Sequence, residues 1–225
     1  MDTVRLIEIK EDIHADNNAV AEKLRVDLSK EKTFLLNLMA SPGAGKTTTI
    51  LKTLEGIGED IRVGVIEADI DSMVDAEKVA AAGTPAVQLR TGGFCHLDAT
   101  MVKKGLKGLN TTQLDLVILE NVGNLVCPAE FDTGAIKNAM ILSVPEGDDK
   151  PLKYPLMFTV CDVLIINKID YIELSDFDMN AMRERVLKLN PNIRIFEISA
   201  KTGQGIETWN SWLKDEVKKF LDPRI

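Results

Sequence analysis

Ala40-Ser41-Pro42-Gly43-Ala44-Gly45-Lys46-Thr47-Thr48-Thr49 is the stretch that decides the fold of this chain of 225 residues. It follows the apolar run 34–39, so a buried strand leads directly into a glycine loop that ends in Gly-Lys-Thr. In such a loop, successive backbone N–H groups point at an anion, and the helix that follows adds its N-terminal dipole. The loop therefore predicts a site for a nucleoside triphosphate, held by Gly43, Ala44, Gly45, Lys46, Thr47 and Thr48.

Two side chains of this loop have separate expected tasks, and one position departs from the usual pattern. Lys46 is expected to meet the β and γ phosphates, and Thr47 is expected to ligate Mg²⁺. The usual pattern begins with glycine, where this chain has Ala40. Alanine is small enough for the loop, but a positive φ at that position would be costlier for it.

The length and composition favour one domain with a large core, since 45% of the residues are hydrophobic. Residues 33–225 are expected to form the nucleotide-binding domain, and residues 1–32, with Val20, Leu24 and Leu28 at helical spacing, a helical extension of it. A net charge of -8 and the lack of a basic patch argue against binding to nucleic acid or to an anionic membrane. The start of the chain lacks a signal segment, and no stretch nears the roughly 20 apolar residues of a membrane span, so a cytoplasmic protein is expected.

Apolar runs alternate with amphipathic stretches, which is typical of βαβ units around a parallel sheet. Continuous apolar runs also suit strands that are covered on both faces. We therefore predict an α/β fold in which a mostly parallel central sheet is flanked by helices on both faces. The predicted strands are 34–39, 62–67, 86–89, 114–119, 140–144, 163–167 and 193–198, and the predicted helices are 48–54, 75–82, 98–109, 178–189 and 205–221. Residues 145–155, rich in Gly, Asp, Lys and Pro, are predicted to form one surface loop.

Asn167-Lys168-Ile169-Asp170 directly follows the sixth predicted strand and indicates which base the nucleotide carries. The carboxylate of Asp170 can accept hydrogen bonds from the ring N1–H and the 2-amino group of guanine, whereas adenine offers neither donor. Lys168 is expected to lay its aliphatic stem along the base, and Asn167 to hold neighbouring loops by side-chain hydrogen bonds. One strand later, a backbone N–H can meet the guanine carbonyl in the segment Ser199, Ala200 and Lys201.

With these three segments in this order, the chain resembles the P-loop GTPases over about residues 34–200. Its segment 120–123, Glu-Asn-Val-Gly, is similar to the subclass that includes signal-recognition and nickel-chaperone GTPases. The resemblance implies that Glu120 reaches Mg²⁺ through water and that Gly123 donates its N–H to the γ-phosphate. It also implies a water-positioning or Mg²⁺-binding carboxylate in the acidic loop 67–75, with Asp69 as first choice and Asp75 as second. A helix N-cap is the alternative role for Asp75, and residues 71 and 72 are interpreted as solvated.

A second group of residues predicts metal chemistry. Cys95 and His96 stand side by side in a glycine-containing loop, and Cys127 lies four residues beyond the predicted γ-phosphate contact. Two thiols and one imidazole suit Ni²⁺ or Zn²⁺, and the ligand types do not separate these ions. Three ligands do not close a tetrahedron, so the fourth is expected to be water, a partner's ligand or a sulfur from a second copy. Cys161, in an apolar run, is interpreted as a buried thiol, and His14, in a charged segment, as a solvated side chain.

The segments 92–99, Gly-Gly-Phe-Cys-His-Leu-Asp-Ala, and 120–128, Glu-Asn-Val-Gly-Asn-Leu-Val-Cys-Pro, resemble the hydrogenase nickel-insertion GTPases of the HypB family. The resemblance places metal ligands on Cys95, His96 and Cys127. It implies a slow GTPase that forms a homodimer with GTP and helps to deliver nickel to the large subunit of [NiFe] hydrogenase, together with a zinc-containing nickel chaperone of the HypA type. Some members also have an N-terminal cysteine motif or histidine-rich tract, and residues 1–32 contain neither.

Three alternatives remain open at this point. A urease-type nickel GTPase has the related motif Cys-Pro-His, whereas this chain has Cys-His at 95–96 and Cys-Pro at 127–128. A metal-independent switch GTPase would use its thiols structurally. A small-molecule kinase would need an acceptor pocket and would gain nothing from the guanine-type segment at 167–170.

Overall fold

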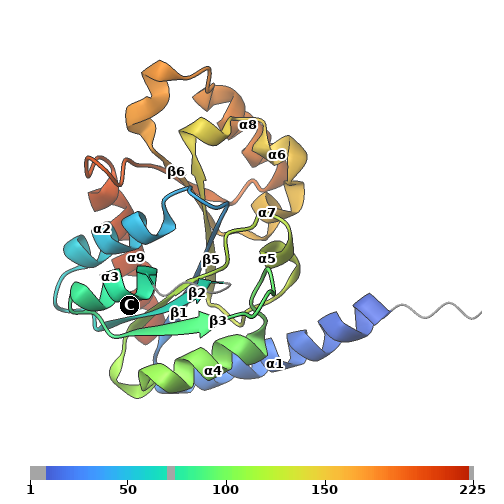
Figure 1. Ribbon diagram of the computed structural model, residues 1–225, viewed down its shortest axis with the longest axis vertical. Coiled ribbons are helices and arrows are strands. Elements are labelled where there is room, and N and C mark those ends of the chain that lie inside the picture. Colours follow the sequence, from blue (N-terminus) through green and yellow to red (C-terminus); the bar gives the residue numbers. More distant parts are fainter. Residues whose placement is uncertain (1–8, 70–73, 223–225) are drawn as a thin grey trace, which may run out of the picture.

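One parallel sheet organises the molecule. The computed structural model describes residues 9–69 and 74–222 (Figure 1). Seven strands of this part pair in the order β3-β2-β4-β1-β5-β6-β7. All neighbouring strands are parallel, and all seven predicted strands are confirmed, with ends shifted by up to three residues. The strands are β1 (Phe34–Ala40), β2 (Val63–Asp69), β3 (Ala86–Arg90), β4 (Leu116–Glu120), β5 (Lys137–Ser143), β6 (Val163–Asn167) and β7 (Arg194–Glu197).

Helices cover both faces of the sheet because the central strands present apolar side chains on each side. In β1, Leu36 and Leu38 pack toward Ile50 and Trp209 of α2 and α9, whereas Leu35 packs on the opposite face. That opposite face is covered by α1 and α4 over one half and by α7 and α8 over the other. The α-helices are α1 (Ile9–Glu31), α2 (Lys46–Ile57), α3 (Val74–Ala81), α4 (Ala99–Leu109), α5 (Cys127–Glu130), α6 (Lys150–Lys153), α7 (Pro155–Val160), α8 (Met179–Leu189) and α9 (Ile206–Leu221). Short 3₁₀ helices are η1 (Thr111–Gln113), η2 (Val144–Glu146) and η3 (Ile169–Leu174).

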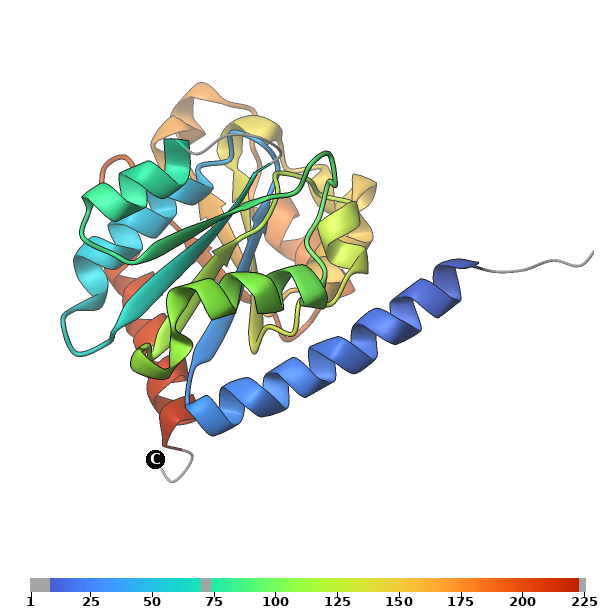
Figure 2. The same ribbon diagram turned by 60° about the horizontal axis from the view of Figure 1, so that its bottom comes forward.

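The long first helix lies beside α4 (Figure 2). Leu24 and Leu28 are buried in the same cluster as Leu106 and Leu109 of α4, as the helical spacing in this segment indicates. Within the two described ranges, no helix combines the length and the apolar character that crossing a bilayer requires.

The prediction of one surface loop at 145–155 is wrong. The segment contains the end of η2, the whole of α6 and the first residue of α7. Pro145, Pro151 and Pro155 each lie in the first turn of one of these helices. Proline is well tolerated there, because its fixed φ suits the helix and its missing N–H would have no partner within the helix anyway. Composition alone therefore misidentified helix starts as loop residues.

A phosphate-binding loop beside a candidate metal centre

The glycine loop joins the buried end of β1 to the start of α2. Ala40 closes β1 without a positive φ, because Lys32, Asn110 and Lys168 are the described non-glycine residues with one. The predicted cost of alanine at this position is therefore absent. Gly45 precedes α2 with φ 102°, and a Cβ there would lie 2.5 Å from the side-chain nitrogen of Asn167. The loop thus needs glycine for both conformation and space.

A cavity of about 510 Å³ opens above this loop. Gly123 borders it and lies so close to the loop that a Cβ on it would come within 3.1 Å of the Pro42 nitrogen. Asp75 lies within the first turn of α3 and pairs with Lys78 at 2.8 Å, so it does not take the N-cap position. Residues 70–73 lie outside the described residues, so the interpretation of residues 71 and 72 as solvated stays a prediction. The predicted phosphate-end residues that line the cavity are Gly43, Gly45, Lys46, Thr47, Thr48, Asp69, Asp75, Glu120 and Gly123.

Two buried carboxylates form the floor of this cavity. Glu67 and Glu120 are paired in register on neighbouring strands, and each is at most 5% exposed. Burial, followed by repulsion from Glu120, raises the pKa of Glu67 to about 10. Burial also raises the pKa of Glu120, against the opposing effect of Lys46. The two buried carboxylates therefore favour holding a proton when no metal ion neutralises them.

The same carboxylates fit a divalent cation. Glu67 Oε1 and Glu120 Oε2 are buried and have no hydrogen-bond partner among the described residues. The hydroxyl of Thr47 lies 3.2 Å from the other oxygen of Glu120. Hard oxygen donors with unfilled bonding capacity, next to a phosphate-binding loop, are the ligands that Mg²⁺ prefers.

The guanine-type segments meet at a smaller cavity of about 290 Å³ next to the glycine loop. Asn167 donates a side-chain hydrogen bond to the Ala44 carbonyl at 2.9 Å and accepts one from the Ala200 N–H at 3.0 Å. The carboxylate of Asp170 accepts a hydrogen bond from the Ser199 hydroxyl at 2.6 Å, which fixes its orientation. The cavity is lined by Gly45, Thr48, Pro145, Asn167, Lys168, Asp170, Tyr171, Ala200 and Lys201.

Two lysines border this cavity in different ways. The ammonium of Lys168 bonds the Gly43 carbonyl at 2.8 Å, so its stem runs from β6 to the glycine loop. The ammonium of Lys201 lies 5.8 Å from the ring centroid of Tyr171. The structure thus brings the predicted base and phosphate residues to the carboxyl edge of one sheet, where ligands of open α/β folds bind.

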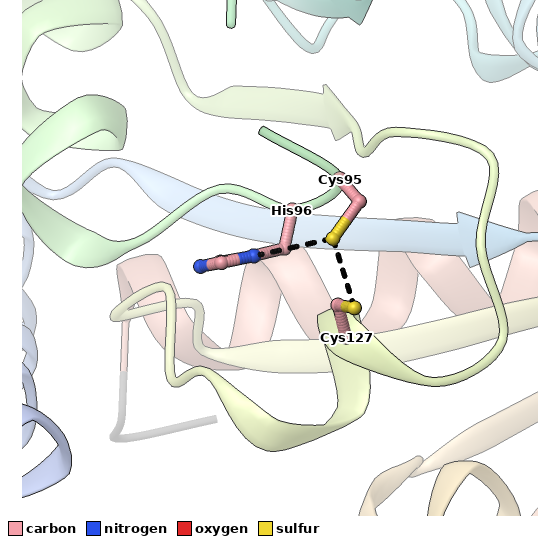
Figure 3. A group of neighbouring side chains, drawn as sticks. All are labelled: Cys95, His96 and Cys127. Atoms are coloured by element: carbon pink, nitrogen blue, oxygen red, sulfur yellow. Dashed lines mark hydrogen bonds between the residues drawn. The ribbon is translucent and has the colours of Figure 1, made fainter. Parts of the chain in front are cut away.

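The three predicted soft ligands also lie together, although Cys127 is 32 residues from Cys95 in the chain. One ligand atom from each of Cys95, His96 and Cys127 falls within 4.8 Å of the others, and all three side chains are half-buried. The two sulfur atoms are 2.9 Å apart, and Nδ1 of His96 is 3.9 Å from the Cys95 sulfur (Figure 3). This donor set suits Ni²⁺ or Zn²⁺.

The surroundings of His96 favour its role as a metal ligand, whereas Cys161 and His14 lie in other environments. Burial lowers the pKa of His96, which favours the neutral imidazole that metals bind. The hydrogen bond with Cys127 raises the pKa of Cys95. Cys161 is 2% exposed in the apolar cluster of α7 and α8, with its thiol 4.0 Å from the Met157 sulfur, which confirms the interpretation of a buried thiol. The interpretation of His14 as a solvated side chain is wrong, because it is half-buried, with its ring centroid 4.8 Å from that of Phe131.

One asparagine connects the phosphate side to the metal side. The N–H of Asn124 bonds the Ala40 carbonyl at 2.8 Å, directly before the glycine loop. Its side chain donates to the Cys95 carbonyl at 3.3 Å and accepts from the Val126 N–H at 2.9 Å, next to Cys127. Asn124 therefore touches the segments of both sites.

Sequence reasoning missed several of these residues as site members. Glu67 belongs to the predicted acidic loop 67–75 but lies buried within β2, and a charged residue between apolar residues of a strand is the signal that points to it. Asn124 lies between two recognised positions, but an asparagine in a loop has many common roles. Phe131 and Asn17, which lie near the metal ligands, gave no local signal.

Comparisons with known proteins identify the relatives of this chain. The model of the "CobW/HypB/UreG, nucleotide-binding domain" family matches residues 34–197. The chain is 42% identical over 221 residues to hydrogenase maturation factor HypB of Azotobacter chroococcum mcd 1, covering 98% of this chain and 72% of that protein. It is similar to the crystal structure of HypB from Helicobacter pylori in complex with nickel, with 38% identity, a TM-score of 0.86 and coverage of 91% and 96% of the two chains. The crystal structure of HypB from Archaeoglobus fulgidus gives 38% identity, a TM-score of 0.84 and coverage of 90% and 99%.

Proposed function

This chain belongs to the CobW/HypB/UreG family, and within it to the HypB hydrogenase maturation factors; from that premise we propose that it is a GTP-binding and GTP-hydrolysing metallochaperone. Its cargo is nickel, and it helps to insert this metal into the large subunit of [NiFe] hydrogenase. The observation that carries the proposal is the cluster of Cys95, His96 and Cys127 beside a phosphate-binding loop. The similar HypB of Helicobacter pylori crystallised in complex with nickel, which supports nickel over zinc as the cargo.

The nucleotide is held from both ends. Lys46 and the N–H groups of residues 43–48 hold the phosphates. The carboxylate of Asp170 selects guanine by accepting hydrogen bonds from the N1–H and the 2-amino group of that base. Thr47 and Glu120, with Glu67 beside them, hold Mg²⁺, which when bound neutralises charge on the phosphates. Asp69 is our first choice for the carboxylate that positions the attacking water, and Asp75 is the second. We expect hydrolysis to be slow.

The metal site is coupled to the γ-phosphate through the segment 120–127. Gly123 donates its N–H to the γ-phosphate, and the next residue, Asn124, is bonded to the carbonyl of Cys95 and to the N–H of Val126, which directly precedes Cys127. Closure of Gly123 on the nucleotide therefore moves Cys127 relative to Cys95. This displacement changes the affinity for the cargo between the GDP and GTP states.

A GTP-dependent homodimer completes the proposal. Phe94 and Val126, the immediate neighbours of Cys95 and Cys127, are 55% and 50% exposed. These apolar side chains beside an incomplete ligand set suit burial against a second copy, which supplies the missing ligand. The other partners are a HypA-type nickel chaperone and the hydrogenase large subunit, and the protein works in the cytoplasm.

Stoichiometric metal binding tests this function. We expect the parent chain to bind Ni²⁺, and Cys95→Ala and Cys127→Ala to lose it while GTP affinity is unchanged. Cys161→Ala, which removes the same thiol from a buried position outside the site, is the matched control and should bind Ni²⁺ like the parent. A parent chain without stoichiometric Ni²⁺ binding would support a metal-independent switch, and Ni²⁺ binding retained in Cys95→Ala and Cys127→Ala would place the metal elsewhere. ATP turnover as fast as GTP turnover would support a kinase.

A further inference from the structure

The buried face of α1 carries a polar residue at the end nearest the metal ligands. Ala21, Leu24 and Leu28 are buried along this face, and Asn17, one turn before Ala21, is only 8% exposed. Burial of an amide is unfavourable unless its donor and its acceptor are both paired. The partners of Asn17 therefore show what this position does.

Asn17 joins the two segments that carry the metal ligands. Its Oδ1 accepts the N–H of Ala99 at 2.9 Å, three residues after His96, and its Nδ2 donates to the carbonyl of Asp132 at 2.8 Å, five residues after Cys127. Ala99 begins α4, so its N–H has no partner within that helix. One amide from α1 thus fixes the start of α4 against the segment that follows α5.

A ring stack adds a second connection between α1 and the ligands. The Phe131 ring lies on the His96 imidazole, with centroids 3.8 Å apart and planes 17° apart. The ring of His14, on α1, lies 4.8 Å from the same phenyl ring. Arg25, further along α1, pairs with Asp132 and donates to the Ala135 carbonyl, which holds the segment that carries Phe131.

We propose that α1 is a positioning element of the metal site, in which Asn17 sets the separation of the two ligand-bearing segments and Phe131 sets the plane of the His96 ring. The inference rests on the proposed metal binding by Cys95, His96 and Cys127. Neither Asn17 nor Phe131 is a ligand, and both act through the residues that are. Residues that orient metal ligands in this way typically change affinity by about 10-fold to 100-fold when they are replaced.

The test is a Ni²⁺ titration of Asn17→Ala, followed by chelator competition and by the thiolate-to-nickel charge-transfer absorption. We expect about tenfold weaker Ni²⁺ binding and a shifted charge-transfer band, with GDP affinity unchanged because Asn17 lies outside both nucleotide cavities. Asn18→Ala removes the same amide from the exposed neighbouring position and should match the parent in affinity and spectrum.

Phe131 provides a second pair of variants that does not depend on the folding of Asn17→Ala. Phe131→Tyr keeps a ring against the imidazole and should retain the parent spectrum, whereas Phe131→Leu should shift it. If both Asn17→Ala and Phe131→Leu match the parent in Ni²⁺ affinity and spectrum, the positioning role of α1 is overturned while the proposed metal site stands. A parent chain that binds no Ni²⁺ would overturn the metal site and this inference with it.

Discussion

Replacing Asn124 by aspartate tests whether this residue transmits the nucleotide state to the metal ligands. The substitution keeps the backbone bond to Ala40 and the acceptor for the Val126 N–H. It removes the donor to the Cys95 carbonyl at 3.3 Å and places a carboxylate oxygen against that carbonyl. The connection to the Cys95 segment is therefore broken while the connection to the Cys127 segment is kept.

The expected magnitude follows from that one contact. Loss of a hydrogen bond that leaves a half-buried carbonyl without its donor costs about 1–2 kcal/mol, equal to about a 5-fold to 30-fold change in an equilibrium constant. Nucleotide coupling of metal affinity is the ratio of the Ni²⁺ affinities in the GTP-analogue and GDP states. We expect this ratio to fall by that factor in Asn124→Asp, while the affinity for GDP stays at the parent value.

The assay is chelator competition for Ni²⁺ in both nucleotide states, for the parent and the variant. Asn192→Asp makes the same change of charge at an exposed position away from both sites and serves as control. A coupling ratio in Asn124→Asp that equals that of the parent would refute the assignment of Asn124 as the connection. A ratio that also changes in Asn192→Asp would mean that net charge, and not this contact, controls the coupling.

Three further substitutions test the nucleotide side. Lys46→Ala removes a buried cation from the phosphates and should weaken GTP binding by about 10-fold to 100-fold and abolish nucleotide-dependent assembly in light scattering; loss of basal Ni²⁺ binding would contradict the separation of the two sites. Asp170→Asn should shift base preference from guanine toward xanthine, measured by competition, and an unchanged preference would remove Asp170 from the base site. Burial and repulsion from Glu120 raise the pKa of Glu67 from its ordinary 4.5 to about 10 on folding, so its contribution to stability is full below pH 4.5 and is lost progressively as the pH rises above it. In urea unfolding without Mg²⁺, Glu67→Gln should therefore gain stability over the parent from pH 5 to pH 8, and a difference that stays constant with pH would show that Glu67 does not titrate in this way.

The strands could be predicted because strands buried on both faces have continuous apolar sequences. The largest error in a strand end shows the limit of this signal. β5 begins at Lys137, three residues before the predicted start, because Lys137 and Asn138 belong to the strand although they are polar. Both bond the carboxylate of Asp162 at 2.7 to 2.9 Å, a partner that hydrophobic patterning does not reveal.

The candidate ligands could be found from sequence because each belongs to a short motif, whereas the residues that hold them could not. Asn17 lies 115 residues from Asp132 and 82 from Ala99, so its role appears only when three distant segments come together. Phe131 follows a four-residue helix that has too few turns to show a helical pattern. The sequence therefore predicts the metal ligands, but the residues that position those ligands are identified only by tertiary contacts.

The three hydrogen bonds of the Asn167 side chain connect the phosphate end of the nucleotide site to its base end, so that the two ends do not move independently. The amide bonds the Ala44 carbonyl in the phosphate loop and the N–H groups of Lys168 and Ala200 beside the predicted base cavity. Substitutions at sites that share such a partner do not have independent energies. In a double-mutant cycle, the losses of GTP affinity from Lys46→Ala and Asp170→Asn should fail to add, and replacing Asn167 by alanine should make them additive.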